Sequence, residues 1–473
     1  MLFSSSIFLF AFLPAVLLGY YVIFRGMRRA QNLLLLAASL LFYAWGEPWF
    51  VLVMIASIFA NYLFGLWVHT WKRRGRRLLL PVTAACVCNL GLLFVFKYLT
   101  FTLENLNLLG LNTPIPVIEL PIGISFFTFQ ALSYVLDMAM GTAQVQRSPF
   151  GLGLYISLFP QLIAGPIVKY ATVADEIQGR KETWDDFSAG CCRFLVGLGK
   201  KVLLSNQLAL VADAAWDTPA GELSTAFAWL GSLCYTLQIY YDFSGYSDMA
   251  IGLGRMFGFH FLENFNWPYL SRSVTEFWRR WHISLSTWFR DYVYIPLGGS
   301  RRGKWRTLRN LFVVWLLTGV WHGANWTFIC WGLFYFLLLV FEKTTGQVSS
   351  WPKVLGWGWT FLMVNFGWVL FRADSLTACG AFLQAMFGQG GGPDLQAAYY
   401  WEQYWIIILL AVFFSFPIAP WLTRKVEAYF GQYARHVFPM WDGVYGLGLL
   451  LIFLAAAAFL VKGTYNPFIY FNF

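Results

Sequence analysis

Apolar segments of membrane-spanning length open this sequence and recur along it. The first, from Leu2 to Phe24, is long enough to cross a bilayer and runs into a basic stretch, with no small-residue cleavage site before it. We therefore interpret it as a retained helix rather than a signal peptide. Further apolar runs extend from Leu33 to Trp45, from Phe50 to His69 and from Leu78 to Phe96. Because lipid offers no partner for free peptide groups, this pattern predicts an all-α polytopic membrane protein.

Composition excludes a water-soluble domain. Hydrophobic residues make up 59% of the 473 residues and charged residues only 12%. The net charge of +10 need not indicate nucleic acid, because basic residues collect in the cytoplasmic loops of membrane proteins. No nucleic-acid-binding motif occurs, so we expect no nucleic-acid partner.

The seven cysteines lie mostly in apolar segments. Neither the spacing of Cys86 and Cys88 nor the adjacent pair Cys191 and Cys192 fits a zinc or thioredoxin pattern. We interpret these residues as small core residues and predict no metal site.

Basic and neutral loops alternate in the first third of the chain. The loop from Lys72 to Arg77 carries five basic residues, whereas the stretch from Asn105 to Gly110 carries none. The positive-inside rule therefore places the loop from Lys72 to Arg77 in the cytoplasm and the N-terminus outside.

Glycines and prolines interrupt the apolar pattern beyond Pro121. The stretches from Pro121 to Phe126 and from Phe159 to Pro166 combine these residues with polar ones. Irregular backbone at membrane depth requires surrounding protein or water, so these stretches are expected to line a cavity or to re-enter the membrane. A pair of kinked helices that serve only packing is an equally good interpretation.

A polar cluster follows the middle of the chain. After a charged amphipathic stretch from Lys181 to Lys201, apolar stretches extend from Val202 to Ala215 and from Ala226 to Tyr241. The cluster then presents four candidate substrate-binding residues: Asp242, Ser244, Tyr246 and Asp248. Such groups in lipid are costly and common along a polar pathway. The alternative is that the two carboxylates only cap helices or pair with the arginines downstream.

A basic, tryptophan-rich stretch comes next. Trp278, Arg279 and Arg280 precede His282, and further arginines follow up to Arg309. The positive-inside rule alone explains most of this charge, and Trp278, Trp281 and Trp288 predict a helix that lies along the membrane surface. The arginines could also attract the phosphates of a cytosolic cofactor or an acidic carrier protein.

His322 lies in a strongly apolar environment. Apolar runs precede and follow it, and Gly319 and Gly323 flank it. An ionisable group at membrane depth marks a functional site by default, and desolvation favours the neutral ring that a general base needs. The two glycines either leave room for a ligand or permit close helix packing. The bland alternative is a hydrogen-bonded core histidine.

Three motifs resemble those of a known family. They are Thr275-Glu-Phe-Trp-Arg-Arg-Trp-His282, Ile295-Pro-Leu-Gly-Gly299 and Gly319-Val-Trp-His322-Gly-Ala-Asn-Trp-Thr327, and all three look like motifs of the membrane-bound O-acyltransferase family. More narrowly, they are similar to the bacterial branch that contains the integral-membrane subunit of alginate O-acetylation. The resemblance runs the length of the chain, through Tyr241-Asp-Phe-Ser-Gly-Tyr-Ser-Asp248 to the terminal residues from Asn466 to Phe473.

The resemblance implies a fold and a site. It implies one membrane-embedded domain over residues 1–473, with about eleven transmembrane helices plus re-entrant and interfacial helices around a central tunnel, in a bacterial cytoplasmic membrane. It places the catalytic histidine at His322 and the second histidine of the bacterial branch at His282. Trp321 and Asn325 are then expected to shape the site, with Arg279 and Arg280 on the side of the donor.

The implied reaction passes an acetyl group across the membrane. The expected donor is a cytoplasmic thioester, either acetyl-coenzyme A or an acyl-carrier protein, with no permanently bound cofactor. The expected acceptor is an external hydroxyl of a glycan such as alginate, peptidoglycan or cellulose, or of a secreted partner protein that carries the acetyl group onward. Two alternatives stay open: a transporter or flippase, although no internal repeat is visible, and a non-catalytic scaffold for polysaccharide export.

Overall fold

The computed structural model describes residues 1–430, 434–463 and 468–469, and in this part of the chain every regular element is a helix. The first part of the chain forms η1 (Phe8–Phe12), α1 (Leu13–Leu18), η2 (Gly19–Ile23), α2 (Arg28–Ala44), α3 (Phe50–Arg73), α4 (Leu79–Leu93), η3 (Phe94–Tyr98), α5 (Leu99–Leu108), α6 (Ile124–Met140), α7 (Pro149–Ser157), α8 (Tyr170–Val173), α9 (Glu176–Gly179), α10 (Trp184–Gly199), η4 (Lys200–Ser205) and α11 (Asn206–Asp217). The second part forms α12 (Thr225–Met256), η5 (Pro268–Leu270), α13 (Val274–Arg280), α14 (Ile283–Phe289), η6 (Arg290–Tyr294), α15 (Lys304–His322), α16 (Trp326–Thr345), α17 (Gln347–Ser350), α18 (Lys353–Arg372), α19 (Leu376–Gln384), η7 (Ala385–Gln389), α20 (Leu395–Phe414), α21 (Ile418–Phe430) and α22 (Ala434–Val461). Here η marks π-helical turns, except η5, which is a 3-10 turn.

The length and composition of the helices confirm a polytopic membrane protein. Within the described residues, seven helical stretches are long and apolar enough to cross a bilayer. They are Phe50–Arg73, Leu79–Leu108, Trp184–Asp217, Trp326–Thr345, Lys353–Arg372, Leu395–Phe414 and Asp442–Val461. Shorter apolar helices cover Phe8–Ile23 and Ile124–Met140.

Two helices differ from the expected bounds. The first apolar helix begins at Phe8 rather than at Leu2, because residues 3–5 form a turn that precedes it. The amphipathic stretch and the apolar stretch after it join into one continuous helix, Trp184–Asp217, through the π-helical turn η4.

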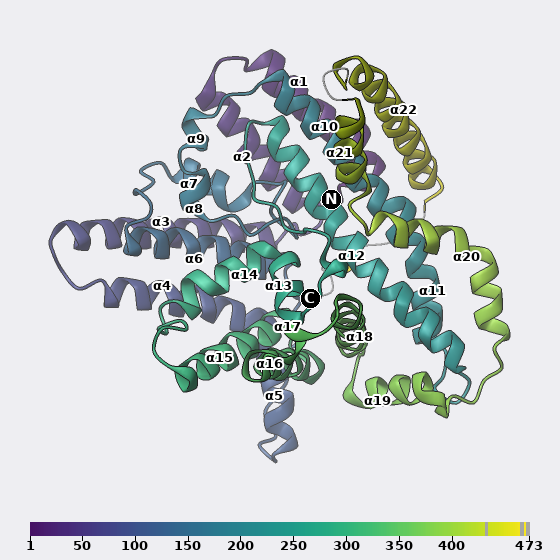
Figure 1. Ribbon diagram of the computed structural model, residues 1–473. Helices are drawn as coiled ribbons and strands as arrows, with labels where there is room; N and C mark the ends of the chain where they lie inside the picture. The colour runs from purple at the N-terminus through teal and green to yellow at the C-terminus, as the bar shows by residue number, and fades with distance from the viewer. Residues whose placement is uncertain (431–433, 464–467, 470–473) are drawn as a thin grey trace.

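Helix α12 crosses the centre of the molecule, and α10 and α11 pack along it (Figure 1). Most residues of α12 are buried, which is typical of a helix surrounded by others. The close approach of α10 depends on glycines, because a Cβ on Gly197 would lie 2.6 Å from the carbonyl oxygen of Gly245. Small residues at a helix crossing allow this contact of backbones in a membrane.

The two irregular stretches of the sequence pack against each other inside the protein. Residues 158–169 contain no helix and are buried almost throughout. Gly123 adopts a positive φ of 75° before α6, and a Cβ there would lie 3.1 Å from the carbonyl oxygen of Leu162. The structure thus places irregular backbone where protein surrounds it, as the requirement to satisfy peptide groups predicts.

The tryptophans of the basic stretch do not form an interfacial belt, and this prediction was wrong. Trp281 is 2% exposed and Trp288 is 5% exposed. Trp288 stacks on Phe129 with ring centroids 3.8 Å apart, and Trp281 packs against Trp368. The helices α13 and α14 therefore turn these two aromatic side chains toward the protein interior, while Arg279 stays exposed.

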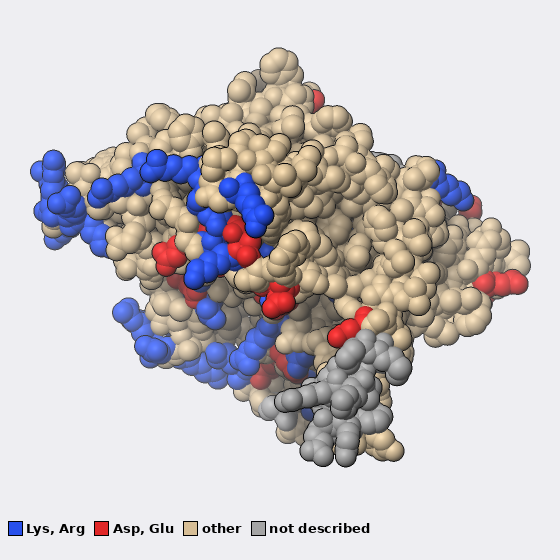
Figure 2. Space-filling model, turned by 90° about the horizontal axis from the view of Figure 1, so that it is seen from above, with Lys and Arg blue, Asp and Glu red and all other residues tan. Residues whose placement is uncertain are grey.

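Charged side chains are unevenly distributed over the surface. Figure 2 shows most Lys and Arg atoms in the left half of one face, interspersed with acidic groups, beside wide areas without charge. All six residues of the loop from Lys72 to Arg77 are exposed. Exposed apolar residues such as Val87 and Leu90 of α4 suit a surface in contact with lipid.

Candidate functional site

His322 is the last residue of α15 and is buried among aromatic rings. It is 4% exposed, and its ring centroid lies 4.9 Å from that of Trp331 and 5.1 Å from that of Phe371. Gly323 then leaves the helix in an extended conformation. The predicted burial of this histidine is confirmed.

The flanking glycines serve close packing. A Cβ on Gly319 would lie 2.5 Å from the carbonyl oxygen of Phe328, and one on Gly323 would lie 2.3 Å from the ring of the same phenylalanine. For Gly319 these contacts support helix packing, whereas Gly323 also lines a cavity, so both interpretations stay open for it. The packing of α15 on α16 fixes the backbone on both sides of His322.

His282 lies in the sharp turn between α13 and α14. Its backbone is left-handed, with φ of 45°, an uncommon conformation for a residue with a side chain. The backbone N–H of Ile283 donates to the carbonyl oxygen of Asn264 at 3.0 Å, and a bridge joins Phe265 to Trp281. The segment after α12 therefore holds the strained turn, and strain of this kind often accompanies function.

Asn264 determines which nitrogen of His282 carries the proton. Its side-chain oxygen accepts the backbone N–H of Ser284 at 3.1 Å, and its NH2 group donates to Ser247 at 3.0 Å. The same oxygen lies 3.2 Å from Nδ1 of His282, which is 1% exposed. An oxygen only accepts, so Nδ1 must donate, and in the neutral ring Nε2 keeps the lone pair.

The two histidines meet at one tryptophan. The ring of Trp321 lies 6.2 Å from His282 and 5.0 Å from His322, measured between centroids. Trp321 is itself 4% exposed and also packs against Phe126 and Phe129 of α6. The structure therefore brings together three of the predicted site residues in one buried centre.

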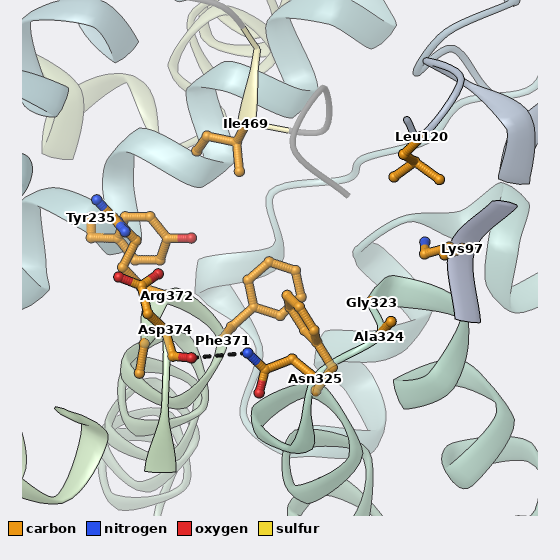
Figure 3. Close-up of a pocket in the computed structure, with 12 residues that line it drawn as sticks. Lys97, Leu120, Tyr235, Gly323, Ala324, Asn325, Phe371, Arg372, Asp374 and Ile469 are labelled. Carbon is orange, nitrogen blue, oxygen red and sulfur yellow. Dashed lines mark hydrogen bonds between the residues drawn. The ribbon is translucent and has the colours of Figure 1, made fainter. Parts of the chain in front are cut away.

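A cavity of about 410 Å³ begins at the residue after His322. Its lining residues come from several helices and the loops between them: Lys97, Leu120, Tyr235, Gly323, Ala324, Asn325, Phe328, Phe371, Arg372, Ala373, Asp374 and Ile469. Figure 3 labels ten of these residues around a common space. Phe371 lies against His322 and also lines the cavity.

Asn325 shapes the wall of this cavity. Its side-chain oxygen accepts the N–H of Thr327 and so caps α16, while its NH2 group donates to the carbonyl oxygen of Asp374 at 2.9 Å (Figure 3). It thereby ties the loop after His322 to the loop after α18. Asn325 lines the cavity, and its predicted role in shaping the active site stays a prediction.

The polar cluster of α12 is paired with basic residues that precede it in the sequence, not with the downstream arginines. Asp242 receives a hydrogen bond from Lys201 at 2.6 Å, and both side chains are 1% exposed. Asp248 binds Lys200 at 2.6 Å and Arg193 at 2.9 Å. The partners come from α10 and η4, which the sequence had suggested only as an amphipathic stretch.

These four residues do not line the cavity. Tyr246 is buried and stacks on Phe3 at 4.8 Å, and Ser244 is buried beside it in α12. The helix does support the site, because Phe243 lies 4.6 Å from His282. Asp242 also accepts the backbone N–H of Ile469, a residue of the cavity wall. Their predicted role in binding substrate stays a prediction.

Trp278, Arg279 and Arg280 are predicted as substrate-binding residues, the two arginines on the side of the donor, and the three differ in exposure. Trp278 packs between Trp315 and Tyr335, with ring centroids 4.9 and 4.8 Å away. Arg280 forms an ion pair with Glu276 at 2.7 Å, whereas Arg279 is exposed. Of the three, Arg279 has the most accessible charge for a ligand.

The sequence did not single out Lys97 or Asn264. Lys97 follows the apolar run from Leu78 to Phe96, and its ammonium reaches the backbone of His322 (Figure 3 shows Lys97 beside Gly323). A lysine directly after an apolar run was the available signal. No signal in the sequence indicates Asn264, because its contact depends on a turn.

Within the described residues, no three His, Cys, Asp or Glu side chains form a group that could hold a metal ion.

Comparison with known proteins gives consistent matches. The model of the MBOAT, membrane-bound O-acyltransferase family matches residues 120–377. A "probable alginate O-acetylase AlgI" of Pseudomonas putida is 41% identical over 100% of both chains. The peptidoglycan O-acetyltransferase of Helicobacter pylori is 37% identical, over 83% of this chain and 80% of its own length. The teichoic acid D-alanyltransferase of Bacillus subtilis is 30% identical, over 53% of this chain and 68% of its own length.

Proposed function

The chain belongs to the membrane-bound O-acyltransferase family, and from this premise we propose that it passes an acetyl group from a cytoplasmic thioester to a hydroxyl outside the membrane. It is a membrane O-acyltransferase, and the relatives named above are acyltransferases of polysaccharides or cell walls. The proposal concerns the donor, the direction of transfer and the residues that perform it.

The position of His322 is the observation that carries the proposal. Helix α15 begins at Lys304 beside the basic loop, which the positive-inside rule assigns to the cytoplasm. Its 19 residues rise by about 28 Å along the helix axis, which separates His322 from the basic loop. His322 then lies at the far end of this helix, and the cavity begins at the next residue, Gly323.

The reaction needs one base and one acyl donor. His322 accepts the proton of the acceptor hydroxyl, and the oxygen attacks the thioester carbonyl. The carbon–sulfur bond then breaks, the acetyl group stays on the oxygen as an ester, and the thiolate leaves and takes up the proton. The products are an O-acetyl ester and a free thiol, so atoms and charges balance.

His282 is suited to orient or polarise a reactant. Asn264 holds its proton on Nδ1, which leaves Nε2 as an acceptor toward a hydroxyl. The nearby Trp321 ring fixes the spacing of the two histidines. A neutral histidine with a defined tautomer needs no reorganisation when the acceptor arrives.

The donor and acceptor are proposed by chemical class. Acetyl-coenzyme A or an acyl-carrier protein would approach the basic side, where Arg279 is exposed, and no permanently bound cofactor is needed. The acceptor is a glycan hydroxyl, or a hydroxyl of a secreted partner protein that delivers the acetyl group to the glycan. The full-length similarity to an alginate O-acetylase supports an exopolysaccharide, and the peptidoglycan relative supports a cell-wall polymer. We place the protein in a bacterial cytoplasmic membrane with its N-terminus outside.

The test is the O-acetyl content of exported glycans in cells that carry wild type, His322→Ala or His282→Ala. We expect loss of acetyl groups at unchanged polymer export and unchanged protein level. His69→Ala is the matched control, since His69 lies on α3 and does not line the cavity. Full acetylation with His322→Ala would refute the assignment, and loss of the exported polymer itself would favour a transporter.

A further inference from the structure

Lys97 and Tyr98 bind three consecutive carbonyl groups at the end of α15. The ammonium of Lys97 donates to the oxygen of Trp321 at 2.7 Å and to that of His322 at 3.1 Å. The hydroxyl of Tyr98 donates to the oxygen of Val320 at 2.7 Å. Two adjacent residues thus bind the last three carbonyl groups of α15. They lie more than 220 positions earlier in the sequence.

This turn needs external partners. The last four carbonyl groups of a helix have none within the helix, and a buried polar group without a partner is costly. Helix α15 ends at His322, and Gly323 continues in an extended conformation rather than in a left-handed cap. The positive charge of Lys97 also interacts favourably with the negative end of the helix dipole.

All three N–H groups of the Lys97 ammonium have an acceptor within the protein. An ammonium carries three N–H groups, and a third acceptor, the hydroxyl of Ser125, lies 3.3 Å from Nζ. The residue is 8% exposed, although its side chain also borders the cavity. A buried charge at this depth is expensive and is kept where it has a specific task.

The backbone around Lys97 is irregular in a specific way. The π-helical turn η3, which contains Lys97 and Tyr98, interrupts the continuous helix Leu79–Leu108. Such turns inside helices occur frequently at functional sites. Within this turn Lys97 is buried against the end of α15, whereas Phe94 and Val95 are exposed.

We propose that Lys97 and Tyr98 form a clamp that positions His322, with Lys97 as the principal positioning residue. The clamp fixes the backbone of the base and thus the direction of its ring toward the acceptor hydroxyl. This inference rests on the proposed role of His322. A displacement of about 1 Å at a reacting group can cost about 100-fold in rate.

The test uses membrane vesicles that contain the full-length protein, with acetyl-coenzyme A as the donor probe and de-O-acetylated exported glycan as the acceptor probe. Release of free coenzyme A gives kcat and KM. For Lys97→Met we expect kcat to fall by about 100-fold while KM for acetyl-coenzyme A changes less than about twofold. Lys97→Arg keeps charge and donors and should recover most of the lost kcat.

Tyr98→Phe removes a single hydrogen bond and should lower kcat by about two- to tenfold. Tyr62→Phe is its matched control, because the Tyr62 hydroxyl donates to the carbonyl oxygen of Arg147 at 2.9 Å on an exposed part of the chain. This control should keep the wild-type kcat.

Three results would overturn the clamp: a Lys97→Met enzyme with kcat within threefold of wild type, a loss confined to KM, or an Arg variant no better than the Met variant. If the Met variant does not accumulate in membranes, equal kcat values for Tyr98→Phe and Tyr62→Phe would overturn it. Failure of the proposed function looks different, because His322→Ala would then stay active. An active wild type, an inactive His322→Ala and fully active clamp variants would remove only this inference.

Discussion

The carboxamide oxygen of Asn264 accepts a hydrogen bond from Nδ1 of His282, at 3.2 Å. Both side chains are 1% exposed, so no solvent competes for this contact. The orientation of the amide is fixed independently by the backbone N–H of Ser284. One asparagine therefore holds both the tautomer and the turn conformation of the second histidine.

Replacing this asparagine should impair the reaction more than the fold. Asn264→Leu removes the acceptor, so His282 can change tautomer and present a proton where the acceptor hydroxyl needs a lone pair. We expect kcat to fall by about 100-fold, within the usual contribution of a positioned acid or base. Asn264→Asp keeps an acceptor and should retain more activity. The measurement is thiol release per folded enzyme in vesicles.

A control separates this effect from the loss of any buried amide. Asn89 donates to Asn61 at 2.8 Å between α3 and α4, away from both histidines. Asn89→Leu should lower thermal stability but leave kcat per folded molecule unchanged. Equal kcat losses in the two leucine variants would rule out a specific role for Asn264.

The sequence predicted the two histidines of the site, because each stands out from its neighbours in polarity or charge. His322 stands in an apolar run, and His282 in a basic, aromatic motif, so both attract attention without a structure. Their contact with Trp321 is consistent with that prediction. The membrane architecture was also predictable, because the lengths of apolar runs are set by the bilayer.

The features that the sequence did not predict are contacts between segments that lie far apart along the chain. Asp242 pairs with Lys201, which lies in a stretch that reads only as amphipathic, and Lys97 meets its carbonyl partners across more than 220 positions. Trp281 and Trp288 have the composition of an interfacial belt, yet they pack inside the protein. Sequence periodicity gives the face of a helix but not the neighbour that covers it.

The buried ion pair of Asp242 and Lys201 should dominate the stability of the central helices. Asp242→Asn removes the carboxylate that pairs with the buried ammonium of Lys201, and we expect a loss of about 3–5 kcal/mol in the free energy of unfolding. The double variant Asp242→Leu with Lys201→Met removes both charges and should recover much of it. Thermal unfolding in detergent measures both.

A more exposed ion pair provides the comparison. Arg372 and Asp213 are 3.1 Å apart, but their side chains are 29% and 46% exposed. Asp213→Asn should therefore cost less than about 1 kcal/mol. Similar losses for Asp213→Asn and Asp242→Asn would show that the burial of Asp242 does not increase its contribution to the free energy of unfolding.

Gly319 should tolerate no side chain. A Cβ there would lie 2.5 Å from the carbonyl oxygen of Phe328, which is backbone and cannot rotate away. Gly319→Ala should separate α15 from α16, cost about 1–3 kcal/mol and lower kcat by moving His322. Gly358→Ala in α18 is the control, because nothing lies within 4 Å of its added methyl group. A Gly319→Ala enzyme as stable and active as the control would contradict this packing.

The ion pairs of Asp291 should make stability depend on pH. Burial opposes ionisation of Asp291, but hydrogen bonds from Arg290 at 2.7 Å and from Lys169 outweigh it and hold the pKa of the carboxyl below its usual range. A carboxyl with a lowered pKa in the folded state contributes stability that is fully present above its unfolded pKa of about 3.9. This contribution is lost as the pH falls through the folded value.

The difference in Tm between wild type and Asp291→Asn should therefore be largest near neutral pH and shrink as the pH is lowered below about 5. Thermal unfolding in detergent across this range measures it. Lys169→Gln removes one cause of the lowered pKa, so it should weaken the pH dependence without abolishing it. A Tm difference that stays constant down to pH values of about 3 would show that ionisation of Asp291 does not stabilise the fold.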